Sequence, residues 1–181
     1  IRGQVILRGG THYVWSRGEE LITDRFPEFT SLSKALPKGT VLDGEILAWQ
    51  DEVPLSFNLL QTRIGRKTVS KAVMSKAPVI LYAYDLLEWQ GKDVRDSSFT
   101  YRRALLEKLC ANTPMTQPLR MSPSVSFQDW SELAASRAKA RDHLAEGLML
   151  KNRNSFYQAG RKKGPWWKWK LDPLTVDAVM I

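Results

Sequence analysis

Charged side chains lie inside or beside apolar, strand-like runs at four places in this sequence. The four stretches are Asp43-Gly44-Glu45, Tyr84-Asp85, Glu146 to Lys151, and Trp166 to Lys170. A buried carboxylate or ammonium group is costly unless it meets a metal, a phosphate or a counter-charge. Acidic and basic sites in this order predict a divalent metal and a nucleotide held over a sheet.

Glu45 lies between Gly44 and Ile46 in the first of these runs. It can be an edge residue that faces water, or a carboxylate that binds a ribose hydroxyl or a metal. Asp43 lies two residues away, so strand alternation places both carboxylates on one face. Two such groups repel each other unless a cation or a hydrogen-bond donor lies between them.

The third run begins and ends with a charge. Glu146 precedes Gly147, a residue type that lets the backbone approach a ligand closely, and Lys151 closes the run after three apolar residues. Strand propensity does not explain charge at both ends, so the run favours a ligand-binding role.

The last run alternates tryptophan and lysine. Lys168 and Lys170 share one strand face, and Trp167 and Trp169 share the other. We expect the tryptophans to fill a core, because large apolar residues are mostly buried. The lysines then point together into a pocket or into solvent, and phosphate is the natural anion for two converging ammonium groups.

Two further features bear on ligands. Tyr82 and Tyr84 share a face of an apolar strand, where Tyr84 can be a core aromatic or a ring stacked on a flat base. From Lys151 to Lys170 there are seven basic residues and no acidic one. This stretch can be a solvated loop, but the absence of acids favours contact with a phosphate backbone.

Hydrophobic periodicity and turn residues predict the elements that position these groups. Strands are expected at residues 4–7, 13–15, 41–49, 79–87, 147–151 and 165–171, and helices at 24–35, 57–64, 99–110 and 127–144.

Composition narrows the class of protein. The 181 residues can form one domain with a sizeable core, and the formal charge of +8 favours a polyanionic partner over a merely solvated surface. Cys110 is the single cysteine, so no disulfide framework exists, and His12 and His143 lack the neighbours of a zinc site. No apolar run approaches the ~20 residues of a membrane span, so a cytoplasmic, nucleoid-associated protein is expected.

The order of the motifs resembles that of the ATP-dependent DNA ligases, members of the covalent nucleotidyltransferase superfamily. The matching stretches, in order, are Ile1-Arg2-Gly3, Ser16-Arg17, Asp43-Gly44-Glu45, Phe57 to Arg63, Tyr84-Asp85, Glu146 to Lys151, and Lys168-x-Lys170. The resemblance spans nearly the whole chain. The tryptophan-rich last motif, and Tyr84 in place of the commoner phenylalanine, look nearest to bacterial repair-type ligases.

The resemblance implies a fold and an activity. The fold is α+β, with antiparallel sheets flanked by helices in an ATP-grasp-like nucleotidyltransferase (adenylation) domain. The activity is that of a monomeric DNA ligase in repair, recombination or replication, which uses ATP and Mg²⁺. It seals nicked double-stranded DNA through enzyme-AMP and DNA-adenylate intermediates.

The resemblance also implies roles for single residues. The implied nucleotide site comprises Arg2, Glu45, Tyr84, Glu146, Lys168 and Lys170. In it Lys168 and Lys170 are the catalytic cations, Glu45 and Glu146 hold Mg²⁺, Tyr84 stacks on adenine, and Glu45 or Arg2 reaches the ribose. The residues that the resemblance implies to face nucleic acid are Arg17 and Arg63, and the basic stretch adds Arg161, Lys162 and Lys163 as expected contacts.

Both ends of the sequence depart from the family pattern. The family motif Lys-x-Asp-Gly-x-Arg carries the lysine that accepts AMP, and no lysine precedes Arg2 here. We therefore expect this stretch alone to form no covalent AMP adduct and to be inactive on its own. Residues 1–172 are expected to belong to the adenylation domain and 173–181 to begin a truncated OB-fold domain.

Two rival interpretations remain at this point. An RNA ligase or an mRNA-capping guanylyltransferase shares the same order of motifs. A non-catalytic nucleic-acid-binding module with this fold would bind DNA through residues 151–170 and never bind ATP.

Overall fold

A computed structural model describes residues 1–160 and 162–173. The chain forms two compact units, which are described separately. Unit 1 comprises Ile1–Pro123 and Asn152–Lys162, and unit 2 comprises Ser124–Lys151 and Lys163–Ile181. Arg161 and residues 174–181 lie outside the described residues, so the expected start of an OB-fold at 173–181 and the boundary at residue 172 stay predictions.

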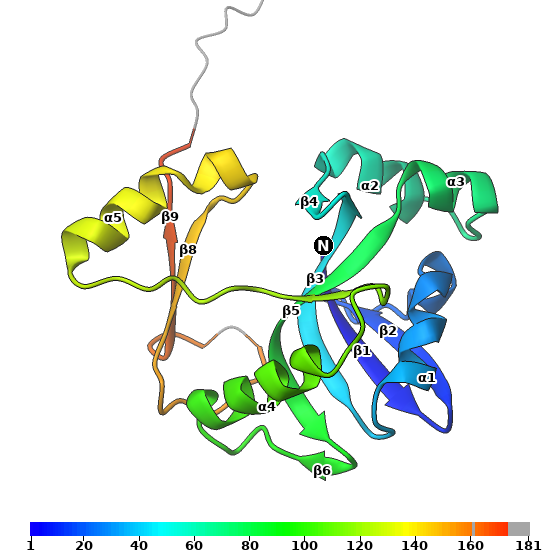
Figure 1. Ribbon diagram of the computed structural model, residues 1–181, viewed down its shortest axis with the longest axis horizontal. Coiled ribbons are helices and arrows are strands. Elements are labelled where there is room, and N and C mark those ends of the chain that lie inside the picture. The colour runs from blue at the N-terminus through cyan, green and yellow to red at the C-terminus, as the bar shows by residue number, and fades with distance from the viewer. Residues whose placement is uncertain (161, 174–181) are drawn as a thin grey trace, which may run out of the picture. The chain divides into compact units, whose positions relative to one another are not determined.

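Unit 1 is built on a seven-stranded sheet (Figure 1). Its strands are β1 (Arg2–Arg8), β2 (Thr11–Ser16), β3 (Val41–Gln50), β4 (Val53–Pro54), β5 (Val79–Trp89), β6 (Lys92–Asp93) and β7 (Leu119–Met121). The main path runs β2-β1-β3-β5-β6, with β4 on β3 and β7 on β5. All of these pairs are antiparallel except β5–β7, so the expected antiparallel architecture is confirmed with one parallel edge.

Alternation along the strands separates a core face from a polar face. In β1, Val5 and Leu7 are buried in the core, as are Leu42 and Ile46 of β3. Ile6 of β1 and Asp43 and Glu45 of β3 lie on the opposite face. One face of the sheet therefore packs against the apolar core, and the other face holds polar side chains that can bind a ligand.

Helices complete unit 1. They are η1 (Thr23–Arg25), η2 (Pro27–Ser31), α1 (Leu32–Ala35), α2 (Phe57–Ile64), α3 (Lys71–Lys76) and α4 (Phe99–Ala111). Ser98 caps α4 by accepting a hydrogen bond from the Tyr101 backbone N–H. From α4 the fully buried Arg102 donates from Nε and Nη2 to the two oxygens of Asp85, at 2.8 and 3.0 Å. This pair joins α4 to β5, so Asp85 is a structural anchor.

The predicted helix over 24–35 is wrong. Three short pieces, η1, η2 and α1, replace it, because Phe26 adopts φ −134° and ψ 57° before Pro27. This break lets the rings of Phe26 and Phe29 stack with 5.8 Å between their centroids, and both rings are fully buried. Burial of two rings thus outweighs helical continuity here.

Unit 2 is a two-stranded antiparallel hairpin with a helical segment. It contains α5 (Trp130–Ala138), η3 (Ala140–His143), β8 (Gly147–Lys151) and β9 (Trp166–Lys170). The helix predicted over 127–144 is therefore shorter, and it is interrupted before η3. Asp129 caps α5 through the Glu132 N–H, and Arg137 donates to the backbone oxygen of Lys170, which ties α5 to β9. Within the described residues, no helix is long and apolar enough to cross a membrane.

Candidate functional site

Asp43 is the centre of a hydrogen-bonded network on the polar face of unit 1. Its side chain is fully buried, and Arg2 donates to it from Nε at 3.2 Å and from Nη2 at 2.6 Å. The phenol of Tyr84 donates to Oδ1 of Asp43 at 3.0 Å, and the phenol of Tyr157 donates to Oδ2 at 2.7 Å. Gln4 donates to the Tyr157 oxygen at 3.1 Å. A buried carboxylate with four donated hydrogen bonds satisfies the condition under which burial of charge is tolerated.

The electrostatics of this network fix its protonation states. The hydrogen bond and charge of Asp43 raise the pKa of Arg2 above its already high ordinary value. Burial, followed by the charge of Asp43, raises the pKa of both Tyr84 and Tyr157 above the ordinary tyrosine value. Both phenols therefore stay protonated at neutral pH and act as donors.

The strand register explains why these residues meet. Gln4 lies opposite Asp43 and Arg2 lies opposite Glu45 in the β1–β3 ladder. Cross-strand partners share a face, so Arg2, Asp43 and Glu45 lie on one face, as the alternation predicts. The side chain of Glu45 is 45% exposed, and its carboxylate lies 3.5 Å from the amino group of Ile1. Asp43 is thus an internal anchor, whereas Glu45 is accessible to a ligand.

Gly44 permits the close approach of β3 and β5 between these two acids. A Cβ atom there would lie 2.8 Å from the Tyr82 carbonyl oxygen and 2.9 Å from Leu81 Cδ1. Tyr82 lies opposite Glu45 in the register, and its ring packs on Trp49 with centroids 5.7 Å apart. The Asp-Gly-Glu order therefore has a packing reason as well as a chemical one.

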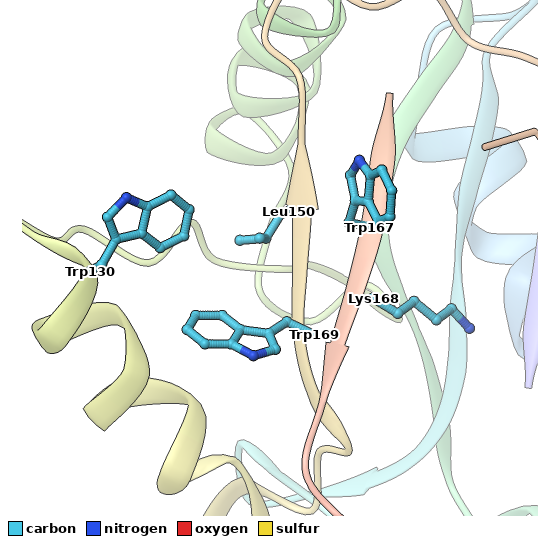
Figure 2. Close-up of a pocket in the computed structure, with 5 residues that line it drawn as sticks. All are labelled: Trp130, Leu150, Trp167, Lys168 and Trp169. Atoms are coloured by element: carbon cyan, nitrogen blue, oxygen red, sulfur yellow. The ribbon is translucent and has the colours of Figure 1, made fainter. Parts of the chain in front are cut away.

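In unit 2, Glu146 forms an ion pair with Lys170, with 2.5 Å between Oε2 and Nζ. Both side chains are more than half exposed. The hydrogen bond from Lys170 lowers the pKa of Glu146, so this carboxylate is ionised at neutral pH. Lys168 is opposite Met149 in the hairpin, and Figure 2 shows it extending from β9 away from Trp130 and Trp169. Lys168 and Lys170 share one face, as predicted.

The tryptophan face of the hairpin forms a shallow, open hollow (Figure 2). Trp130, Leu150, Trp167, Lys168 and Trp169 line this space of about 310 Å³. The Trp169 ring packs edge-on against the Trp130 ring, with 6.2 Å between ring centroids. The guanidinium carbon of Arg137 lies over the same Trp169 ring, 5.2 Å from its centroid. Trp167 is 61% exposed, so the expectation that it fills a core is wrong for the described residues.

The expected surface position of Arg63 is also wrong. Arg63 is fully buried, and it donates to Glu28, to the Arg25 carbonyl at 2.8 Å and to the Ala77 carbonyl at 3.0 Å. Its guanidinium also lies over the Phe26 ring. Arg63 is a structural residue that joins α2 to its neighbours, because its contacts among the described residues all lie within unit 1.

The other residues expected to face nucleic acid are at the surface where the structure describes them. Arg17, Lys162 and Lys163 are all exposed. Arg161 lies outside the described residues. The described chain holds no cluster of three or more His, Cys, Asp or Glu side chains that could bind a metal. Mg²⁺ commonly binds proteins through one or two carboxylates, with waters and substrate phosphates as its other ligands.

Tyr157 is the functional candidate that sequence reasoning missed. It stands in the polar segment after β8, where no periodicity marks it. Its backbone N–H donates to the Arg95 carbonyl at 2.8 Å, which fixes the segment against unit 1. The aromatic pair Phe156-Tyr157 in an otherwise polar, basic loop was the available signal.

Comparison with known proteins now decides the family. The family model described as "ATP dependent DNA ligase domain" matches residues 1–170. The chain belongs to the ATP-dependent DNA ligase domain family. The family resemblance seen in the motifs is therefore confirmed, and with it the nucleotidyltransferase fold.

Relatives of this ligase-family chain come from bacteria and archaea. A protein of Koribacter versatilis named "Probable DNA ligase" is 33% identical over 201 residues, which cover 99% of this chain and 35% of that protein. A DNA ligase of Natronomonas pharaonis is 34% identical over 181 residues, covering 99% of this chain and 32% of that protein. The chain therefore spans about a third of the length of the curated relatives it matches.

Solved structures give the same fold. A mycobacterial DNA ligase D complexed with ATP and MES superposes with a TM-score of 0.72 at 30% identity, over 93% of this chain and 50% of that chain. The ligase domain of LigD from M. tuberculosis superposes with a TM-score of 0.71 at 31% identity, over 93% of this chain and 51% of that chain. Chlorella virus DNA ligase-adenylate superposes with a TM-score of 0.62 at 19% identity, over 93% of this chain and 60% of that chain. At this identity the likeness supports the fold alone.

Proposed function

We propose that this chain provides the adenylate-handling part of a DNA ligase that seals nicks in duplex DNA. The observation that carries the proposal is the polar sheet face that brings Arg2, Asp43, Glu45 and Tyr84 together within the region matched by the ligase family model. The Glu146–Lys170 pair and Lys168 supply charges of both signs in unit 2.

The proposed reaction consists of three displacements at phosphorus. A lysine amine attacks the α-phosphate of ATP, so that an N–P bond forms and pyrophosphate leaves. The 5′-phosphate oxygen at the nick then attacks this AMP, and the lysine leaves. Finally the 3′-hydroxyl attacks the 5′-phosphate, a proton is lost from that hydroxyl, and AMP leaves. Each step needs positioned reactants and neutralised charge more than an elaborate base.

Within this scheme the geometry favours different roles for the residues of unit 1. The guanidinium of Arg2 is committed to Asp43 and Tyr157, whereas Glu45 is 45% exposed. Glu45 is thus the better candidate to accept a hydrogen bond from a ribose hydroxyl. The hydrogen bond from Tyr84 to Asp43 fixes the orientation of its ring, which suits a stacking platform for adenine.

The remaining charges suit phosphate and metal. Lys168 and Lys170 are proposed to neutralise the α-phosphate, and the carboxylates of Glu45 and Glu146 to serve as protein ligands of Mg²⁺. The bound ion would polarise the phosphate as a Lewis acid. Arg17, Arg161, Lys162 and Lys163 are proposed to contact the DNA backbone.

Nucleotide-dependent thermal unfolding of the chain tests the proposal. A ligand that binds only the native state raises the melting temperature by mass action. We expect ATP with Mg²⁺ to raise it in a concentration-dependent manner, and GTP to raise it less. A shift with GTP alone would favour a guanylyltransferase, and no shift with either nucleotide but retained DNA binding would favour a non-catalytic binding module.

A matched pair of variants tests whether Lys168 contributes to ATP binding. Lys168→Gln should weaken the ATP-dependent shift, whereas Lys92→Gln removes the same charge from an exposed position in β6 and should not. Equal effects of the two variants would refute the assignment of Lys168 to the phosphate.

A further inference from the structure

The segment that contains α2 and α3 is basic and free of acids. No aspartate or glutamate occurs between Glu52 and Asp85. The basic residues of this stretch are Arg63, Arg66, Lys67, Lys71 and Lys76. Arg63 is buried, and the other four are exposed. Four cations thus reach solvent from one continuous segment that has no carboxylate of its own.

Arg66 differs from most arginines of unit 1 in lacking an acidic partner. Eight of those arginines form an ion pair with a carboxylate: Arg2, Arg8, Arg25, Arg63, Arg95, Arg102, Arg103 and Arg120. Among the described residues, no ion pair involves Arg66, Lys67, Lys71 or Lys76. Arg66 donates from Nε only to the Thr62 carbonyl, at 2.9 Å. The positive charge of this segment is therefore not neutralised within unit 1.

A buried contact holds the two helices of this segment together. The buried guanidinium of Arg63 donates to the Ala77 carbonyl, which ties the end of α2 to the end of α3. Figure 1 shows the two helices next to one another at one end of the sheet. Lys67 lines a hollow of about 220 Å³ together with Leu21, Ile22, Asp24 and Arg25, which places it beside η1. Asp24 is the acidic residue among those that line this hollow.

We propose that Arg66, Lys67, Lys71 and Lys76 form an additional DNA-backbone contact surface, named here the α2–α3 basic surface. The inference rests on the proposed DNA substrate. Lys71 and Lys76 are the first and last residues of α3, so they are separated by a rise of ~7.5 Å along the helix axis. Each strand of a DNA duplex presents one phosphate per ~3.4 Å of its axis, so separate cations of one segment can meet separate phosphates. Contacts of this kind position a protein on DNA without reading its sequence.

Salt-dependent binding to a nicked duplex tests the surface. The variant R66Q/K67Q/K71Q/K76Q removes the proposed contacts. The control K34Q/K38Q/K92Q/K108Q removes the same total charge from four exposed lysines elsewhere in unit 1. Each lost phosphate contact should reduce the slope of log K against log salt by ~0.9. We expect the surface variant to lose ~2–4 units of slope and at least ~10-fold in affinity, and the control to lose less than ~2-fold.

Lysine acetylation of the unsubstituted chain gives a second readout that does not depend on folding of a variant. Nicked duplex should protect Lys67, Lys71 and Lys76 from acetic anhydride, as read by mass spectrometry, while Lys34, Lys38 and Lys92 stay reactive. Equal protection of both sets, or equal loss of affinity in both variants, would show a general charge effect and overturn the surface.

The outcomes separate this inference from the proposed function. If the unsubstituted chain binds nicked DNA but the surface variant keeps the full slope, the surface is refuted and the proposed function stands. If the unsubstituted chain shows no salt-dependent DNA binding, the surface and the proposed DNA substrate both fail. The ATP-dependent thermal shift then shows whether nucleotide binding survives.

Discussion

At the scale of single residues, the buried carboxylate of Asp43 organises the polar face of unit 1. It holds Arg2, Tyr84 and Tyr157 in fixed positions and leaves Glu45 accessible. Within one motif, Asp43 therefore stabilises the structure, whereas the neighbouring Glu45 is accessible to a ligand. Stability and ligand affinity should respond differently to changes at these two positions.

Tyr157→Phe should lower the free energy of unfolding by about 1.5–3 kcal/mol, because it removes a hydrogen bond to a buried charged group. Urea unfolding of the chain measures this. Tyr101→Phe is the control, because Tyr101 is 49% exposed on α4. A loss no greater than that of the control would contradict the proposed strength of the Asp43 network.

His12 should make unit 1 sensitive to acid. It is 7% exposed, and neither ring nitrogen has a hydrogen-bond partner in the part of the chain that the structure describes. Burial lowers the pKa of His12 below its ordinary value, and a polar interaction with the Phe26 backbone offsets only part of this effect. The stability that depends on neutral His12 is therefore present above about pH 6.5 and is lost as pH falls below that value.

The acid sensitivity can be assigned because the chain has only two histidines. The free energy of unfolding should fall between pH 7.5 and pH 5, and His12→Phe should flatten this part of the profile. His143→Gln, at an exposed position in η3, should leave the profile unchanged. A profile that depends on His143 and not on His12 would refute the assignment.

At the scale of elements, the β8–β9 hairpin should distinguish its two tryptophans. Trp169 packs against Trp130 and Arg137, whereas Trp167 is 61% exposed. Truncation of a well-packed tryptophan costs up to ~3–5 kcal/mol, and surface changes cost ~0.5 kcal/mol or less. Amide hydrogen exchange of β8 and β9 should therefore accelerate much more in Trp169→Ala than in Trp167→Ala. The reverse order would mean that Trp167 carries the packing.

The same hairpin depends on Gly147. Its φ is +142°, and a Cβ atom there would lie 2.2 Å from the Trp169 carbonyl oxygen. Gly147→Ala should break the register next to Lys170 and abolish protection of the β8–β9 amides. Gly65→Ala is the control, since nothing lies within 4 Å of a Cβ atom at that position. Retained protection in Gly147→Ala would show that the hairpin tolerates a side chain there.

Sequence patterns predicted the strands of this fold better than its irregular parts. The strands that contain Glu45, Tyr84 and Lys168 were predicted within a few residues, because alternation of apolar and polar residues carries that information. The short pieces around Phe26 were missed, since the stacking of Phe26 on Phe29 outweighs local propensity. The burial of Arg63 and the role of Tyr157 arise from contacts between residues 14 to 155 positions apart, which no local pattern records.

At the scale of the whole molecule, the positive charges fall into two groups: those paired with carboxylates and those exposed to solvent. Most arginines of unit 1 are paired with carboxylates, while Lys162, Lys163 and the α2–α3 basic surface are open to solvent. A formal charge of +8 that is concentrated in such open groups suits a polyanionic substrate. One chain must therefore recognise both an adenylate and a DNA backbone.

The measurement that tests this requirement most directly compares two nicked duplexes that differ only at the 5′ end. One carries a 5′-phosphate and the other a 5′-adenylate, which is the DNA-adenylate intermediate of the proposed reaction. Equilibrium binding by fluorescence anisotropy should show tighter binding of the adenylated nick. Tyr84→Ala should reduce this preference, and an intact duplex should bind more weakly than either. Equal affinity for the two nicks, with Tyr84→Ala indistinguishable from the unsubstituted chain, would contradict the account.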